Sequence, residues 1–319
     1  KNNEKSMEEK LTAFTESCDN TNTIPKFFIS TLESTLRVNN LFKIAIKGTP
    51  EFRFDDLSIT TLVESIIKAD ILLVDLSLTY HRINDSGFEV ISRLLNQGSL
   101  AEENSRSHLE GLDLEGNDIT GSSFEVANFT SSYDCPLVFL NLSCNPISLA
   151  GQRTIANIVL NNKILRQLSI CSCGFEMVSL IELASNLLEN STLQLLYVDR
   201  PFLSTSRKDE IADHFSRVLA KSNTLCDISM KFFNILDHGA KLLADALCLN
   251  ESILSLNLEC NNIGISGAEH LASYLLLRRK NSLHSLGLAY NNVGDDGAVA
   301  LSEVYPIIYR LFPLKVLIK

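Results

Sequence analysis

The apolar positions of this chain follow one pattern that recurs along most of its length. The stretch LVFLNLSCNPISLAG (137–151) returns as ILSLNLECNNIGISG (253–267), and both fit L-x-x-L-x-L-x-x-N-x-I-x-x-x-G. The L-x-L part alternates with period two, which predicts a short strand whose leucines share one side. After the glycine, apolar residues recur three and four positions apart, as in AKLLADAL (240–247), which predicts a helix.

Eight copies of this strand-turn-helix pattern stand in register. They begin at Leu73, Leu109, Leu137, Leu165, Leu193, Leu225, Ile253 and Leu283. A weaker forerunner begins at Leu41, and Leu314 begins a copy that the end of the sequence interrupts. Successive copies start 28 to 36 residues apart, and a period near 28 is typical of leucine-rich repeats.

A single strand with one helix cannot bury its own apolar side, so neighbouring copies must stack. Strands stack about 4.8 Å apart, whereas helix axes need about 8–10 Å. The stack should therefore bend with its strands inside. We expect an α/β leucine-rich repeat solenoid, a horseshoe with an inner parallel sheet, outer helices and about 8–10 repeats.

The two ends differ from the repeats, and they set the expected domain organisation. Residues 1–40 should form an N-terminal helical cap or extension, and residues 41–319 the solenoid, with its last repeat incomplete. The apolar residues Met7, Leu11, Phe14 and Cys18 predict one helix. A second helix should start at Pro25 and carry Phe28, Ile29, Leu32 and Leu36. This extension either covers the first repeat or binds a partner, and the final LFPLKVLIK needs more chain or a partner at its strand edge.

The asparagine that follows each strand has a predicted structural role. Its amide can both donate to and accept from backbone groups of the turn. His81 occupies this position once, and we expect it to make the same turn hydrogen bonds. Cys173, Pro201 and Phe233 replace asparagine in three successive copies, and a polar insert, STSRKDE (204–210), follows Pro201. This region is either a tolerated irregularity or a ledge that a ligand uses.

Composition narrows the class of partner. The formal net charge is −10 and the pI about 5.1, which argues against nucleic acid as the main partner. No apolar run is long enough to cross a bilayer. The eight cysteines are too few for a disulfide scaffold, and we expect them to be reduced and mostly buried. These features predict an intracellular protein, cytoplasmic with ciliary, axonemal or nuclear sites as alternatives.

The sequence contains no catalytic or cofactor-binding signature. A P-loop, a dinucleotide-binding glycine motif, a zinc-protease motif and a nucleophile elbow are all absent, and the six histidines are dispersed. We therefore expect a non-enzymatic protein with no cofactor and no metal.

The outward-facing strand positions form a candidate binding surface. Of 24 such positions in the eight copies, six are acidic and one, Lys231, is basic, in a chain with 38 acids and 28 bases. Aromatic residues accompany the acids. The predicted partner-binding residues of this concave face are Asp75, Tyr80, Asp113, Glu115, Phe139, Tyr197, Asp199, Asp227, Phe232, Glu259 and Tyr290. Rings as anchors and carboxylates as steering groups suit a basic protein partner. Alternatively, the rings fold onto neighbouring strands and the acids only solvate the sheet.

The 28-residue period with a full helix per repeat resembles the ribonuclease-inhibitor-like class of leucine-rich repeat proteins. The resemblance implies a scaffold that binds other proteins, either as a soluble inhibitor or adaptor or as a piece of a large assembly such as a ciliary axoneme. A GTPase-activating regulator that uses the horseshoe rim is the alternative, with Arg200 and Asn145 as the nearest candidate groups. The sensor end of an immune receptor is a further alternative.

Overall fold

A computed structural model gives the arrangement of most of the chain. The residues that it describes are 7–19, 21, 24, 42–95, 109–125, 137–203, 209–277, 283–309 and 315–317. They fall into two compact units, residues 1–154 and 155–319, which divide within one helix.

Strands and helices alternate along most of each unit, except that β4 follows β3 directly among the described elements. The elements of the first unit are α1 (Met7–Asp19), β1 (Phe42–Lys47), α3 (Asp56–Lys68), β2 (Leu73–Thr79), α4 (Asp85–Leu95), β3 (Gly111–Asp113) and β4 (Phe139–Asn141). Helix α5 (Leu149–Asn161) contains the boundary. The elements of the second unit are β5 (Gln167–Ser169), α6 (Met177–Leu187), β6 (Leu195–Tyr197), α7 (Glu210–Lys221), β7 (Asp227–Ser229), α8 (Asp237–Leu249), β8 (Ser255–Asn257), α9 (Ile265–Leu277), β9 (Ser285–Gly287), α10 (Gly294–Tyr309) and β10 (Lys315–Leu317).

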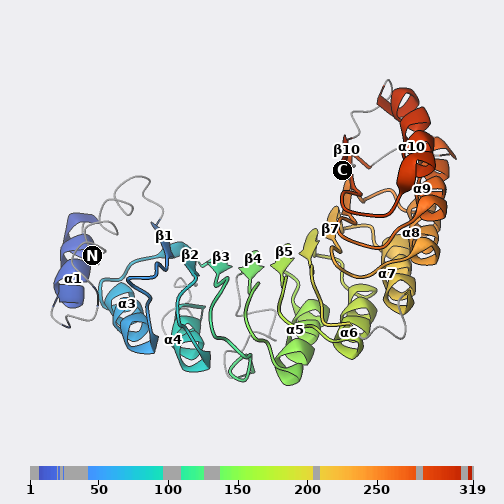
Figure 1. Ribbon diagram of the computed structural model, residues 1–319. Helices are drawn as coiled ribbons and strands as arrows, with labels where there is room; N and C mark the ends of the chain where they lie inside the picture. The colour runs from blue at the N-terminus through green and yellow to red at the C-terminus, as the bar shows by residue number, and fades with distance from the viewer. Residues whose placement is uncertain are drawn as a thin grey trace. The chain divides into compact units, whose positions relative to one another are not determined.

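Each unit stacks its strands in parallel, with equivalent residues paired. In the first unit Leu76 pairs with Leu112, and Leu112 with Leu140. In the second unit Leu196 pairs with Ile228, and the same register continues through β8 to β9. In β10 Val316 pairs with Leu286, so the copy that the pattern begins at Leu314 is offset by one residue from the predicted alignment. Within each unit the helices lie on one side of the strands (Figure 1). The predicted fold class, an α/β leucine-rich repeat solenoid, is confirmed.

The repeat leucines form the core between strands and helices. The three leucine positions of the strand pattern are at most 4% exposed in all eight copies. The isoleucine position is also buried in most copies, as are apolar residues on one side of the helix, for example Ile263, Ala268 and Leu271. Burial of such an apolar side chain contributes about 1.5–3 kcal/mol to stability. The forerunner is a true repeat too, since Ile44 and Ile46 of β1 are buried.

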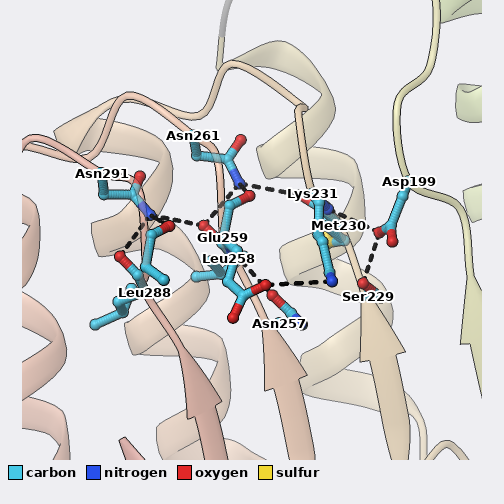
Figure 2. Close-up of polar contacts among 11 residues, drawn as sticks. Asp199, Ser229, Met230, Lys231, Asn257, Leu258, Glu259, Asn261, Leu288 and Asn291 are labelled. Carbon is cyan, nitrogen blue, oxygen red and sulfur yellow. Dashed lines mark hydrogen bonds and ion pairs between the residues drawn. The ribbon is translucent and has the colours of Figure 1, made fainter. Parts of the chain in front are cut away.

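The asparagines after the strands join the repeats into a ladder of hydrogen bonds. Each side-chain amide donates to a carbonyl of the preceding repeat and to one of its own. Asn261, for example, donates to Met230 O and Leu258 O, both at 3.0 Å (Figure 2). Its Oδ1 accepts from Ile235 N at 3.1 Å. Asn291 continues the ladder, with Leu258 O as a shared acceptor at 2.8 Å. Asn117 and Asn145 share Leu114 O in the same way in the first unit.

His81 substitutes for asparagine with both ring nitrogens, as the sequence predicts. Its Nδ1 accepts from Phe54 N at 3.0 Å, so Nε2 carries the proton and donates to Ile46 O at 3.1 Å. The ring is 2% exposed and stacks on Phe54 at 4.8 Å between ring centroids. Burial lowers the pKa of His81, and the positive charge of Arg53 lowers it further. The ladder therefore requires the neutral imidazole.

The irregular copies keep their turns although they lack asparagine. Cys173 donates its thiol to Cys171 O at 3.5 Å, and Phe233 is fully buried with its ring edge-on to Phe215. The strands on both sides of Pro201 stay in register. These observations favour a tolerated irregularity at the ladder positions. Most of the polar insert, residues 204–208, lies outside the described residues.

The N-terminal helix packs inside the first unit. Leu11, Phe14 and Cys18 are at most 3% exposed, and Lys10 forms an ion pair of 2.8 Å with Asp70. This contact agrees with a cap, but the boundary at residue 40 stays a prediction. The second predicted helix, from Pro25 to Leu36, lies outside the described residues, as does most of the C-terminal LFPLKVLIK apart from β10.

The cysteines are less buried than predicted. Among the seven that the structure describes, Cys18 and Cys173 are buried, whereas Cys144 and Cys248 are exposed and the other three are intermediate. The prediction of mostly buried cysteines was wrong, because several stand in turns and at a helix end rather than on the leucine face. No helix in the described ranges is long and apolar enough to cross a membrane.

The neutral state of His81 predicts an acid-sensitive first repeat. Its pKa is lower in the folded chain than in the unfolded chain, so the stabilisation is complete above about pH 6.5 and is lost as the pH falls below that value. We expect His81→Asn to have the wild-type melting temperature at pH 7.5. Between pH 7.5 and pH 5.5 the melting temperature of His81→Asn should fall less than that of the wild type. Equal losses for both proteins, measured by circular dichroism, would show that the histidine does not set this sensitivity.

Candidate functional site

Two sets of side chains face away from the core next to each strand. The strand face consists of the outward residues of the strands and of the position after each strand's last leucine, including Asp75, Asp113 and Glu115 in the first unit and Tyr197, Asp199, Asp227, Lys231 and Glu259 in the second. The turn rim is the single residue that precedes each ladder position. Its members are Tyr80, Gly116 and Cys144 in the first unit and Ser172, Arg200, Phe232, Cys260 and Tyr290 in the second.

Every residue of the turn rim has a left-handed backbone. Their φ angles lie between 55° and 70°, and only one of the eight residues is glycine. In several repeats the rim amide extends the strand pairing, as Arg200 N does by donating to Lys231 O at 2.9 Å. A left-handed conformation costs a side-chain-bearing residue about 1–2 kcal/mol relative to the right-handed one. The turn therefore explains the left-handed backbone of these residues. It does not explain which side chains they carry.

Asp113 is the centre of a hydrogen-bonded network on the strand face of the first unit. Its Oδ1 accepts from Asn141 Nδ2 at 2.9 Å and from Glu115 N at 3.2 Å, and its Oδ2 accepts from Ser77 Oγ at 3.3 Å. Burial raises the pKa of the Asp113 carboxyl, and the hydrogen bond from Glu115 N offsets only part of that effect. The negative charge of Asp113 therefore lowers the stability of the folded chain.

Tyr80 lies at the rim beside this network and is held on several sides. Its hydroxyl donates to Glu115 Oε1, which raises the pKa of Tyr80 to about 12. The ring lies against Gly116, where a Cβ atom would come within 2.6 Å of it, and Lys47 Nζ lies 4.9 Å from the ring centroid. The tyrosine ring is 39% exposed. The close approach of the ring therefore favours glycine at 116, whereas the seven other rim residues adopt a similar positive φ with a side chain.

Asp75 and Phe139 complete the predicted residues of the first unit. Asp75 forms an ion pair with Lys43 of the neighbouring strand β1. Phe139 is half-buried in β4, where its backbone is paired with Gly111. Neither residue is fully available to a partner.

In the second unit Asp199 and Glu259 contact the turn and strand of the repeat that begins at Leu225. Asp199 Oδ1 accepts from Ser229 Oγ at 2.6 Å and from Lys231 N at 2.9 Å. Lys231 Nζ forms an ion pair of 3.2 Å with Glu259 Oε2 (Figure 2). Lys231, the one basic residue among the outward strand positions of the eight aligned copies, is thus neutralised by one of their acids.

Tyr197 and Asp227 form a second half-buried pair on the same unit. The Tyr197 hydroxyl donates to Asp227 Oδ2 at 3.3 Å. Burial raises the pKa of Asp227, with hydrogen bonds from Ser255 and Tyr197 opposing the shift, and burial together with the Asp227 charge raises the pKa of Tyr197. Asp227 therefore resembles Asp113, since both are carboxylates held in a partly dehydrated position.

The turn rim of the second unit carries its exposed rings. Phe232 is 40% exposed and Tyr290 is 63% exposed. The Arg200 guanidinium lies over the Phe232 ring, with Cζ 4.1 Å from the centroid. The exposed Phe202 belongs to the same turn as Arg200, and its amide donates to Phe175 O at 2.8 Å.

The predicted site residues thus lie where the pattern places them, but many are already engaged. The acids bond to lysines, hydroxyls or amides of neighbouring repeats, and two of the tyrosines donate to acids. The sequence interpretation missed the stacking of Arg200 on Phe232 and of Lys47 on Tyr80. The shared rim position of Arg200, Phe232 and Tyr290 in the aligned repeats is the signal that could have revealed the rim.

Other chemistry finds little support in these arrangements. Among the described residues no group of three or more His, Cys, Asp or Glu side chains is arranged to hold a metal ion. Asn145, a candidate rim group for a GTPase regulator, is instead 1% exposed and bonded within the ladder. Arg200 is exposed.

Comparison with known proteins agrees with the repeat architecture. A family model described as Leucine Rich repeat matches residues 249–272 and 279–302. The chain is 25% identical over 283 residues to the ribonuclease inhibitor of Sus scrofa, covering 85% of this chain and 57% of that protein. It is 25% identical over 179 residues to NACHT, LRR and PYD domains-containing protein 4C of Mus musculus, covering 56% and 18% of the two chains. The chain thus carries leucine-rich repeats, is distantly similar to ribonuclease inhibitor, and spans less than two thirds of either relative.

Three solved structures are similar to the chain at a greater distance. A TLR13–ssRNA13 complex gives a TM-score of 0.45 at 17% identity, covering 81% of this chain and 33% of that one. Leiomodin-1 actin-binding site 2 gives 0.37 at 14% identity, covering 43% and 78%. The tropomodulin C-terminal domain of Caenorhabditis elegans gives 0.29 at 15% identity, covering 52% and 79%.

The raised pKa of Asp113 predicts that its charge destabilises the folded chain at neutral pH. Because the folded state binds this proton more tightly, stability falls as the pH rises above 3.8 and the full cost is present at pH 7. We expect Asp113→Asn, which keeps the acceptor oxygen, to raise the melting temperature at pH 7 by about 1–2 °C. Asp118→Asn removes an exposed carboxylate of the same repeat and should leave the melting temperature unchanged. A lower melting temperature for Asp113→Asn would contradict this account of the network.

Proposed function

We propose that this chain is a protein-interaction scaffold whose strand face and turn rim form the binding surface. Stacked repeats generally provide extended surfaces for protein partners. The observation that carries the proposal is the kind of residue that stands at the turn rim. All eight rim residues have a positive φ, and Tyr80, Arg200, Phe232 and Tyr290 are large and exposed there.

Folding alone would favour other residues at these positions. Glycine and asparagine adopt the left-handed region at lower cost than aromatic residues or arginine. Phe232 and Tyr290 gain little in return, since 40% and 63% of their surfaces remain exposed. Exposed aromatic side chains and arginines are the residue types that contribute most to protein interfaces. A role in binding accounts for side chains that the turn itself does not favour.

The partly buried acids support a basic segment as the partner. Asp113 and Asp227 hold carboxylates whose pKa values are raised by burial, so each charge costs folding stability. A cationic partner that approached these oxygens would recover part of that cost. The acids paired with Lys43 and Lys231 are less available, which concentrates the proposed attraction on Asp113 and Asp227.

Narrower assignments rest on the sequence alone. Two segments, ADALCLNESILSLNLECNNI (244–263) and DRPFL (199–203), resemble leucine-rich repeat-containing protein thirty-four. A cytoplasmic location, a role in a ciliary assembly and regulation of a GTPase through Arg200 stay predictions. Only the last of these predictions has an observation beside it, which is that Arg200 is exposed at the rim.

Quantitative affinity capture from cells that express the chain tests the scaffold proposal. The rim variant Phe232→Ser/Tyr290→Ser removes two exposed rings of the second unit. The control Val178→Ser/Val299→Ser removes two apolar side chains on helices α6 and α10, which are 59% and 53% exposed. We expect the rim variant to lose at least about tenfold in recovery of its main partners, the effect of about 1.4 kcal/mol, and the control to keep them.

A third arm tests the basic character of the partner. Asp227→Asn should weaken capture of the same partners, more strongly at low salt, although we expect it to stabilise the fold. Equal recovery by the wild type, the rim variant and the control would contradict the proposed surface. Loss in the rim variant with unchanged recovery by Asp227→Asn would retain the surface and contradict the basic partner.

A further inference from the structure

Arg200 is a cation with a fixed position on the turn rim. Its φ of 58° lies in the left-handed region, and its amide donates to Lys231 O at 2.9 Å. The guanidinium lies over the Phe232 ring with Cζ 4.1 Å from the centroid. Stacking on an aromatic face satisfies the flat surface of a guanidinium but leaves the N–H groups along its edge free to donate. The backbone and the ring together restrict where those donors can point.

No acid of the described chain uses these donors. Arg200 has no ion pair or side-chain hydrogen bond among the described residues, and its side chain is exposed. Two acids of the strand face in this unit have partners of their own. Asp199 accepts from Ser229 Oγ and Lys231 N, and Glu259 is paired with Lys231 Nζ (Figure 2). Arg200, which follows Asp199 but bonds to no acid among the described residues, is therefore available to an external anion.

The surroundings of Arg200 add an apolar component. Phe232 beneath the guanidinium is 40% exposed, and Phe202, two residues further along the same turn, is 73% exposed. Phe202 N donates to Phe175 O at 2.8 Å, which anchors the backbone from which this ring projects. A partner that approached Arg200 would therefore meet a bidentate cation with aromatic surface nearby.

We propose that Arg200, stacked on Phe232, receives a carboxylate of the protein partner, an aspartate or glutamate that has an apolar neighbour in its own sequence. The proposal rests on the scaffold function and names one contact within it. The planar guanidinium can bind both carboxylate oxygens through parallel N–H···O bonds, a geometry that lysine cannot reproduce. The basic segment proposed for Asp227 and this acid would then be separate parts of one partner surface.

Selection from a random dodecapeptide library displayed on phage tests this contact with a defined probe. The purified chain is the bait, and Arg200→Gln and Arg217→Gln are selected in parallel. Arg217 is the matched control, because it is an exposed arginine of the same unit that is already paired with Asp213 at 2.5 Å. We expect acid-plus-apolar peptides to be enriched by the wild type and by Arg217→Gln, and that enrichment to disappear with Arg200→Gln.

A double-mutant cycle then assigns the contact. Dissociation constants are measured by fluorescence anisotropy for the best peptide and its Glu→Gln or Asp→Asn form, each against the wild type and Arg200→Gln. Removing either the peptide carboxylate or the Arg200 guanidinium should weaken binding about tenfold. Removing both groups should weaken binding no more than removing one of them. Phe232→Leu should also weaken binding several-fold, because it removes the ring that holds the guanidinium.

The possible failures are distinct. Additive losses in the cycle, or acidic peptides that bind Arg200→Gln equally well, would overturn the carboxylate contact. If peptides are enriched without an acid but still lose binding with Phe232→Ser/Tyr290→Ser, the scaffold surface stands and this inference falls. A wild-type chain that enriches no peptide over the Phe232→Ser/Tyr290→Ser variant would contradict both.

Discussion

The structure depends on hydrogen bonds that each repeat makes with the next one. A strand of three residues followed by a tight turn leaves buried carbonyl and amide groups without partners inside its own repeat. The ladder asparagines supply those partners from the neighbouring repeat, as Asn261 does for Met230 O and Ile235 N. Because an unpaired buried backbone group costs about 1–3 kcal/mol, no repeat is stable alone, and stacking is a requirement of the sequence.

This constraint also determines which side chains are displayed. The turn holds the residue before the ladder position in the left-handed region in all eight repeats, including the repeats that lack the asparagine. The leucines are buried in the core, whereas the rim residues project away from it. Phe232 and Tyr290 at the rim, and Asp113 and Asp227 on the strand face, all occupy positions at some cost to stability. Such costs are characteristic of surfaces that are retained for binding.

Much of this architecture could be predicted because the repeat pattern is local. The leucine spacing gives the strands, their register and the core, and the ladder role of His81 follows from its place in the alignment. The ion pairs of Asp75 and Glu259 could not be predicted, since they join residues about 30 positions apart whose distance depends on the spacing of parallel strands. Stacking of Arg200 on Phe232 depends in addition on side-chain conformation. The exposure of Cys144 and Cys248 reflects their positions in a turn and at a helix end.

The stability of two neighbouring asparagine variants tests the ladder most directly. Asn261→Ala leaves Met230 O and Ile235 N unpaired in the interior, and we expect a loss of about 2–4 kcal/mol in the free energy of unfolding. Asn262 is exposed and its side-chain amide donates only to the side chain of Asn234 among the described residues, so Asn262→Ala should cost less than about 0.5 kcal/mol. Urea denaturation of both variants gives the comparison. Similar, small losses would contradict the claim that the ladder holds the repeats together.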